Sequence, residues 1–114
     1  LVAESGVILS KVTIVRNKSN YNYVGVDVGM NVLVRPMLYD AYHPIYNISS
    51  DMKDTYTVQV VGPICESGDI LGKNIKLPKN TKVDDVLLIE NTGAYGKVMA
   101  CDYNMRGLLK EIII

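Results

Sequence analysis

The chain has 114 residues, the size of one ordinary domain, and 48% of them are hydrophobic while 21% are charged, which excludes a disordered or fibrous chain. Twelve basic and twelve acidic side chains cancel, so the positive excess that nucleic-acid binding needs is missing and nucleic acid is not an expected partner. No apolar stretch approaches the roughly 20 residues of a membrane-spanning helix and no signal peptide opens the chain, so the sequence predicts a soluble domain without a membrane partner.

Strands are expected where apolar and polar residues alternate, because a strand turns successive side chains to opposite faces of a sheet. Val12 and Ile14 begin such a pattern, and Val24 to Val28 repeats it after a polar turn at 17–20. The expected strands lie around residues 12–14, 24–28, 56–60, 86–89 and 108–114.

Two short helices are expected between the strands. Pro36 suits the first turn of a helix that runs to Tyr42 and is closed by Pro44, because the N–H group that proline lacks is not needed there. A second helix is expected over about 94–102. The chain shows no repeat and no linker, so it is predicted to be one mainly β domain over 1–114, an antiparallel β-sandwich or barrel with one or two short helices.

Both ends of the chain are apolar. It begins at Leu1 without an initiator methionine, and it stops at Ile114 in a run of three isoleucines. Because natural termini are usually polar and frayed, the sequence is expected to be a fragment of a longer polypeptide.

The segment 62–69 has an unusual density of reactive side chains, with Cys65, Glu66, Ser67 and Asp69 within five positions. Two neighbouring carboxylates disfavour a thiolate, so Cys65 is expected to stay protonated, which suits a proton donor better than a nucleophile. The alternative is an acidic surface turn beside a cysteine that is buried as a small hydrophobic residue. Composition alone leaves both interpretations open.

The two cysteines, Cys65 and Cys101, have neither a C-x-x-C spacing nor a cluster with the lone His43, so no metal site is predicted. A disulfide between them is not excluded, but without an export signal we expect a reducing cytoplasm and two free thiols. His43 is expected to be a satisfied structural histidine without a catalytic role.

Arg35 and Tyr39 lie four positions apart, which puts them on one face of the expected helix. A guanidinium group with a phenol beside it is a fitting receptor for a carboxylate, because arginine offers paired planar donors and keeps its charge. The simpler alternative is a surface arginine beside a packing tyrosine.

A third segment, Asn91 to Gly96, is a turn that contains two glycines and presents the hydroxyl group of Tyr95. Glycines let the backbone come close to a ligand, although a turn of this kind can also simply connect two secondary-structure elements.

Read together, these segments resemble the C-terminal β-domain of the diaminopimelate decarboxylases, pyridoxal-phosphate-dependent enzymes of the alanine racemase and ornithine decarboxylase fold type. The resemblance covers most of the chain in four ordered motifs: Gly25-Val26-Asp27-Val28-Gly29-Met30-Asn31, Arg35-Pro36-x-x-Tyr39-Asp40-Ala41-Tyr42-His43, Gly62-Pro63-x-Cys65-Glu66-Ser67-Gly68-Asp69, and Gly93-Ala94-Tyr95-Gly96 followed by Tyr103-Asn104-x-Arg106. The Cys-Glu-Ser-Gly-Asp string separates this group from ornithine-type relatives, which usually read Cys-Asp-Gly-x-Asp there.

The resemblance implies a longer enzyme in which an N-terminal barrel carries the Schiff-base lysine and binds most of the pyridoxal 5'-phosphate. It also implies a cytoplasmic homodimer that converts the amino acid meso-2,6-diaminopimelate to L-lysine and CO₂. In that family the active site is composite, because the Cys-Glu loop reaches into the barrel of the neighbouring chain. The 114 residues alone are therefore not expected to decarboxylate.

The resemblance also assigns roles to five residues. Cys65 would return a proton to the substrate after CO₂ has left. Arg35 and Tyr39 would hold the distal carboxylate of the substrate, and Glu66 would accept its distal ammonium group. Tyr95 would contact both substrate and cofactor, the latter at its phosphate.

Two alternatives remain open. The first keeps the fold and changes the substrate to ornithine, lysine or carboxynorspermidine, but Arg35 and Glu66 argue against it, because a substrate without a distal carboxylate has no use for the arginine. The second is a non-catalytic β-module used for pairing or regulation, which would need no thiol at Cys65.

Overall fold

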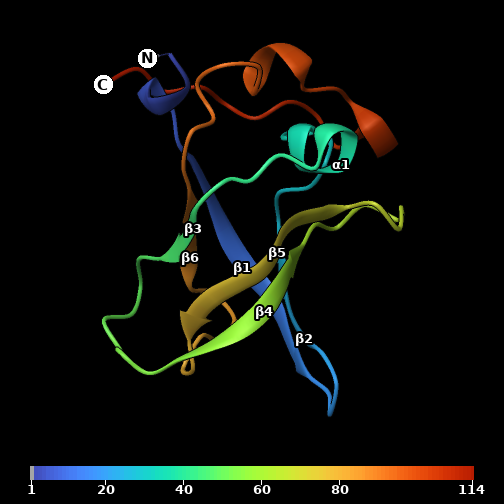
Figure 1. Ribbon diagram of the computed structural model, residues 1–114. Helices are drawn as coiled ribbons and strands as arrows, with labels where there is room; N and C mark the ends of the chain where they lie inside the picture. Colours follow the sequence, from blue (N-terminus) through green and yellow to red (C-terminus); the bar gives the residue numbers. More distant parts are fainter. Residues whose placement is uncertain (1) are drawn as a thin grey trace.

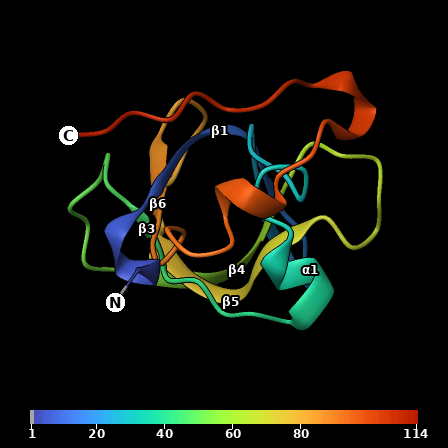
Figure 2. The ribbon, with the colours of Figure 1, turned by 90° about the horizontal axis from the view of Figure 1, so that it is seen from above.

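The computed structural model describes residues 2–114, and its main feature is one curved sheet of six strands (Figure 1). The strands follow the spatial order β3-β6-β1-β2-β4-β5, and the two edge strands β3 and β5 contact each other, so the sheet is nearly closed into a barrel (Figure 2). Their bounds are β1 Ile8–Asn17, β2 Asn22–Val26, β3 Ile45–Asn47, β4 Thr55–Val61, β5 Ile70–Pro78 and β6 Val86–Ile89. The predicted mainly β barrel-like fold is confirmed.

One strand pair departs from the expected antiparallel arrangement. β2 and β4 run parallel, with Val24 opposite Val60, whereas the other four pairs of the described residues are antiparallel. Parallel strands need a long crossover connection rather than a tight turn. The chain between β2 and β4 supplies it, because it contains both α1 (Arg35–Tyr39) and β3.

The barrel interior is filled by the apolar members of the alternating segments. Val12, Val24 and Val60 have no exposed surface, and Leu33 from the crossover joins them in the same core. Burying a side chain of this size stabilises a fold by about 1.5–3 kcal/mol. The alternation in the sequence therefore corresponds to a real interior face.

The helical predictions were right in place and too long in extent. α1 ends at Tyr39 rather than Tyr42 because Asp40 takes a left-handed backbone conformation with φ of 53°. The predicted helix over 94–102 is reduced to the 3₁₀ turn η2, Lys97–Met99, since Tyr95 just before it has φ of 58°. Two other 3₁₀ turns, η1 (Ala3–Ser5) and η3 (Tyr103–Met105), complete the helical part of the described chain.

The predicted strand over 108–114 is wrong. This segment forms no strand, and Ile112 and Ile113 are 79% and 94% exposed. A strand is stabilised by hydrogen bonds to a neighbouring strand, and here none of the six strands pairs with it. Periodicity missed the strands β3 and β5. β3 is only three residues long. In β5, Gly72 and the left-handed Asn74 interrupt the alternation of apolar and polar residues.

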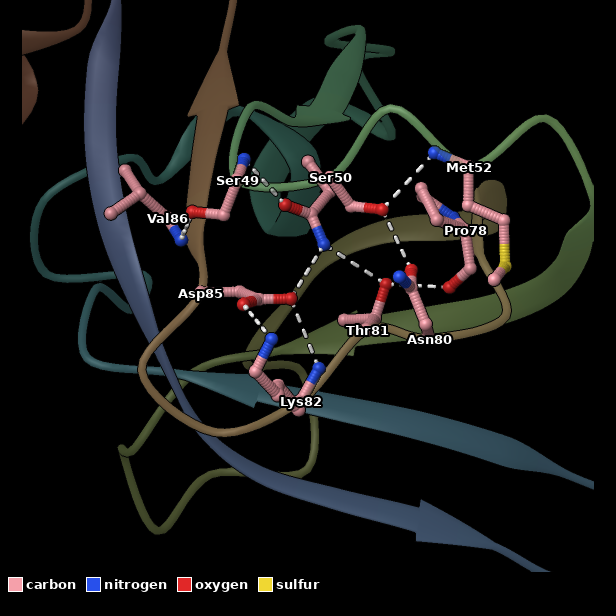
Figure 3. A network of polar contacts seen from close by, with 10 residues as sticks. Ser49, Ser50, Met52, Pro78, Asn80, Thr81, Lys82, Asp85 and Val86 are labelled. Atoms are coloured by element: carbon pink, nitrogen blue, oxygen red, sulfur yellow. Dashed lines mark hydrogen bonds and ion pairs between the residues drawn. The ribbon is translucent and has the colours of Figure 1, made fainter.

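A buried polar network holds the connections beyond the C-terminal end of β5 (Figure 3). The amide of Asn47 in β3 donates to Asp85 at 2.9 Å and to Thr81 at 3.1 Å, and the hydroxyl of Thr81 donates to the carbonyl of Pro78 at 2.6 Å. The N–H of Lys82 also donates to Asp85, at 3.1 Å. The network ties β3, β5 and β6 together at this end.

None of the helices in the described part of the chain is long and apolar enough to cross a membrane.

Candidate functional site

The loop 62–69 joins β4 to β5, and one buried aspartate holds it in place. Asp69 is 3% exposed, and its two carboxylate oxygens accept hydrogen bonds from the N–H of Met30 at 2.6 Å and of Ile64 at 2.7 Å. Burial raises the pKa of this carboxyl group, while the two main-chain bonds and the charge of Arg106 act in the opposite direction. Asp69 thus links the loop to the turn that follows β2.

Two glycines make this link sterically feasible. A side chain at Gly62 would collide with the carboxylate of Asp69 and with the backbone of Gly29, and one at Gly29 would come within 2.9 Å of Asp69 Oδ2. Only residues without a Cβ let the two backbones pass this closely around the carboxylate. The motif glycines are therefore explained by the packing of Asp69.

The anchored loop presents Cys65 and Glu66 at the surface. Both side chains are exposed, so the interpretation of Cys65 as a buried small hydrophobic residue is wrong. Glu66 Oε1 accepts hydrogen bonds from the hydroxyl of Ser67 and the N–H of Gly68, both at 3.3 Å. Asp69, expected as a second surface anion beside the thiol, is instead buried and bound to main-chain N–H groups.

The C-terminal part of the chain returns to this loop and contacts the thiol. The N–H of Cys101 donates to the carbonyl of Asn31 at 2.7 Å, which fixes the segment against the turn after β2. Three residues later the amide of Asn104 donates to Cys65 Sγ at 3.4 Å. Sequence reasoning gave Asn104 no role, since no local signal connects positions 39 residues apart. Both cysteines are free thiols, as expected.

A second cluster gathers around Arg35 at the start of α1. Its guanidinium carbon lies over the rings of Tyr39 and Tyr95, 5.9 and 6.0 Å from the ring centres, which is within the range of cation–π attraction. The predicted contact of Arg35 with Tyr39 is therefore present, and the structure adds Tyr95 to it. The arginine is half-buried, and no carboxylate of residues 2–114 forms a salt bridge with it.

A pocket opens beside this cluster, lined by Ala3, Arg35, Tyr42, His43, Asn91, Ala94 and Tyr95. The turn that carries Tyr95 is fixed against the start of the chain, because the N–H of Gly93 donates to the carbonyl of Ala3 at 2.9 Å and a side chain at Gly93 would collide with Val2. Tyr95 keeps φ of 58°, a conformation that is uncommon for an aromatic residue.

His43 is buried, and the expectation that it is satisfied is only half right. Its Nδ1 lies 3.0 Å from the carbonyl of Glu90, so this nitrogen carries the proton and donates. Its Nε2 is buried and has no hydrogen-bond partner in the described part of the chain.

The two clusters lie next to each other. Met37 in α1 reaches the loop 62–69, where a Cβ at Gly68 would come within 2.9 Å of the Met37 side chain. The structure thus brings Arg35, Tyr39 and Tyr95 into one cluster and places Cys65 and Glu66 on the adjacent loop. Within residues 2–114, no three His, Cys, Asp or Glu side chains gather closely enough to hold a metal ion.

Comparisons with known proteins agree on one family. The family model described as "Pyridoxal-dependent decarboxylase, C-terminal sheet domain" matches residues 2–93. A diaminopimelate decarboxylase from Zymomonas mobilis is 43% identical over 114 residues, which cover all of this chain and 27% of that protein. A diaminopimelate decarboxylase from Archaeoglobus fulgidus is 40% identical over 117 residues, again covering all of this chain and 27% of the relative.

Solved structures point the same way. The crystal structure of diaminopimelate decarboxylase from Helicobacter pylori, complexed with L-lysine, is similar with a TM-score of 0.84 and 39% identity, covering 96% of this chain and 28% of that one. The chain therefore spans little more than a quarter of the length of the relatives that it matches.

Proposed function

The chain belongs to the pyridoxal-dependent decarboxylases, as their C-terminal sheet domain, and from this premise we propose that it is the part of a diaminopimelate decarboxylase that completes the active site. In this proposal an N-terminal barrel of the same protein binds most of the cofactor and carries the Schiff-base lysine. The whole enzyme is a cytoplasmic homodimer that converts meso-2,6-diaminopimelate to L-lysine and CO₂.

The observation that carries the proposal is the exposed pair Cys65 and Glu66 on a rigidly anchored loop. A loop that served only as a turn would need neither a buried carboxylate to hold it nor a thiol at its surface. An exposed and well-anchored loop can reach into the barrel of a neighbouring chain, because Asp69 holds its conformation without any partner. We therefore place the active site at the interface of two chains.

The pocket beside Arg35 fits the phosphate of pyridoxal 5'-phosphate and does not fit its aldehyde. Asn91 and Tyr95 line the pocket with hydrogen-bond donors for a phosphate, and no lysine of residues 2–114 lines it. Tyr95 would hold the phosphate and would also contact the substrate. When bound, the cofactor supplies the electron sink that makes loss of CO₂ feasible, and the barrel would hold its reactive carbon.

The substrate end farthest from the reacting carbon would be bound by residues of this chain. Within residues 2–114 no carboxylate forms a salt bridge with Arg35, and its positive charge lies next to the hydroxyl-bearing Tyr39, a combination suited to a carboxylate. Glu66 Oε1 is engaged by Ser67 and Gly68, which leaves Oε2 to accept a hydrogen bond from the distal ammonium group. A substrate such as ornithine would leave Arg35 without a partner.

The thiol of Cys65 would return a proton to the substrate carbon that has lost CO₂. Asn104 can only donate through its amide nitrogen, so its contact occupies a lone pair of the sulfur and leaves the S–H free to point elsewhere. This arrangement supports a proton donor, with Cys65 as the catalytic residue and Asn104 as a residue that orients it.

The test is Cys65→Ala in the full-length enzyme. We expect kcat to fall by about 10²–10⁴-fold, the usual contribution of a positioned general acid, while cofactor affinity stays unchanged. Cys101→Ala is the matched control, since Cys101 is also an exposed free thiol and should not alter kcat. Mixing Cys65→Ala chains with chains that lack the Schiff-base lysine should restore activity in heterodimers with one intact composite site. Wild-type turnover by Cys65→Ala, or no recovery in verified heterodimers, would contradict the proposal.

A further inference from the structure

The guanidinium carbon of Arg35 lies 5.9 and 6.0 Å from the centres of two aromatic rings that come from distant parts of the chain. Tyr39 is one helical turn after it, while Tyr95 is 60 positions away on the turn after β6. Both tyrosines are mostly exposed, at 60% and 63%, so the positions of their rings are not explained by burial in the core. The guanidinium group is what the two rings share.

We propose that the ring of Tyr95 is a positioning element for Arg35 and thereby determines selectivity for ligands with a distal carboxylate. This inference rests on the proposed function, in which Arg35 binds that carboxylate. It separates two roles within one side chain, because the hydroxyl group of Tyr95 is proposed to contact the cofactor phosphate while its ring acts on Arg35.

The physical argument starts from the geometry of a guanidinium group. Its N–H donors lie in the plane of the group, whereas a cation–π contact uses the faces of aromatic rings. Two rings within about 6 Å therefore restrain where Arg35 lies without offering it a carboxylate. Because residues 2–114 supply no salt-bridge partner for Arg35, its charge remains available for a ligand.

The backbone of Tyr95 supports the same conclusion. A tyrosine with φ of 58° is held in a sparsely populated conformation, and such strain persists only where the surroundings enforce it. Here the enforcing contacts are the hydrogen bonds from Thr92 to Gly6 at 3.0 Å and from Gly93 to Ala3 at 2.9 Å. These contacts fix the turn that carries Tyr95, whose ring stays largely exposed while its centre lies 6.0 Å from the guanidinium carbon of Arg35.

The proposal predicts that two ligands differ in how strongly their binding depends on the Tyr95 ring, whatever the affinity for the cofactor. L-lysine keeps the carboxylate farthest from the reacting carbon, whereas 1,5-diaminopentane has the same chain and amino groups without that carboxylate. Removal of the Tyr95 ring should weaken the binding of the first ligand more than that of the second, because a direct contact with Tyr95 is lost for both ligands whereas the contact with Arg35 concerns only the carboxylate. The ratio of their inhibition constants therefore reports on Arg35 alone.

The experiment compares Tyr95→Asn with Tyr95→Phe in the full-length enzyme at saturating pyridoxal phosphate. Asparagine removes the ring and tolerates a positive φ, so the turn can keep its conformation, while phenylalanine keeps the ring and removes only the hydroxyl group. We expect Tyr95→Asn to raise the inhibition constant of L-lysine relative to that of 1,5-diaminopentane by about 2- to 30-fold, which corresponds to one cation–π contact. Tyr95→Phe should keep the wild-type ratio of the two constants.

The outcomes separate the inference from the function on which it rests. An equal change of the ratio in both variants would mean that the hydroxyl group is responsible, and an unchanged ratio in Tyr95→Asn would mean that the ring is not needed; either result overturns the inference and leaves the proposed function intact. A wild-type enzyme that does not decarboxylate meso-2,6-diaminopimelate would overturn both. A crystal structure of Tyr95→Asn in which Arg35 has left its wild-type position would support the inference directly.

Discussion

Two buried aspartates each lie immediately before a strand, Asp69 before β5 and Asp85 before β6, and their surroundings move their pKa values in opposite directions. Asp69 receives only main-chain N–H donors, and burial raises its pKa. Burial also favours a higher pKa for Asp85. Hydrogen bonds from Asn47 and Lys82 and the charge of Lys82 outweigh this effect, so the pKa of Asp85 is lowered. Hydrogen bonds and neighbouring charges thus offset the effect of burial less completely for Asp69, at the candidate site, than for Asp85 in the network of Figure 3.

The opposite pKa shifts of Asp69 and Asp85 agree with the different roles proposed for the two regions. In the proposed function the loop 62–69 presents Cys65 and Glu66 at the surface in one conformation, and the buried carboxylate of Asp69 holds that conformation. The region around Asp85 joins three strands, and its polar groups hold the barrel together through hydrogen bonds. Substitutions should therefore affect both activity and stability at the first region and stability alone at the second.

The largest effect is expected from Asp69→Ala. The N–H groups of Met30 and Ile64 would stay buried without an acceptor, and each such group destabilises a fold by about 1–3 kcal/mol. Chemical unfolding should show a loss of about 2–6 kcal/mol, and kcat of the full-length enzyme should fall because the Cys65 loop is released. Asp69→Asn, which keeps one acceptor oxygen, should lose less. A variant within about 0.5 kcal/mol of wild type, the range of an ordinary surface substitution, would show that Asp69 does not anchor the loop.

A smaller effect is expected from Asp85→Ala. It removes the acceptor for the Asn47 amide and for the N–H of Lys82, but the network still offers Thr81 to Asn47. We expect a loss of about 1–3 kcal/mol in unfolding free energy, with kcat and KM of the folded full-length enzyme unchanged. A change in kcat at full cofactor occupancy would mean that the two regions are not independent.

The comparison also predicts opposite dependences on pH. The lowered pKa of Asp85 means that its stabilising contribution is complete above the ordinary value of 3.8 and is lost as pH falls through the folded-state pKa. The raised pKa of Asp69 means that its contribution is complete below 3.8 and is lost as pH rises through the folded-state pKa.

The measurement is urea unfolding of wild type, Asp85→Asn and Asp69→Asn between about pH 3 and pH 7, a range that spans the ordinary carboxyl pKa values. As pH falls, the stability advantage of wild type over Asp85→Asn should shrink, and its advantage over Asp69→Asn should grow. Two difference curves that slope the same way would refute the assignment of opposite shifts.

The smallest effect is expected from Lys82→Gln. Its ammonium group lies 3.6 Å from Asp85, but the lysine side chain is 75% exposed, and exposed ion pairs contribute no more than about 0.5–1 kcal/mol. Lys79→Gln, which breaks the exposed pair with Asp54 at 3.1 Å, is the matched control. A loss for Lys82→Gln as large as that for Asp85→Ala would mean that the charge, rather than the hydrogen bonds, stabilises this region.

Periodicity predicted much of the barrel, and its failures have physical causes. Val12, Val24 and Val60 alternate with polar residues and do line the core. The apolar run 108–114 has the composition of a strand, but pairing depends on a neighbour that composition does not reveal. The parallel pairing of β2 with β4 was equally hidden, because it depends on the route of the crossover.

The sequence by itself determined the family resemblance, the order of the motifs and the candidate residues Cys65, Glu66, Arg35, Tyr39 and Tyr95, because residue types and short spacings are local properties of the chain. Only the tertiary structure decided that Asp69 is an anchor rather than a surface anion, that Asn104 contacts Cys65, and that Tyr95 joins Tyr39 over Arg35. Each of these contacts joins positions from different segments of the chain. Their formation depends on how the barrel closes, which no short stretch of sequence specifies.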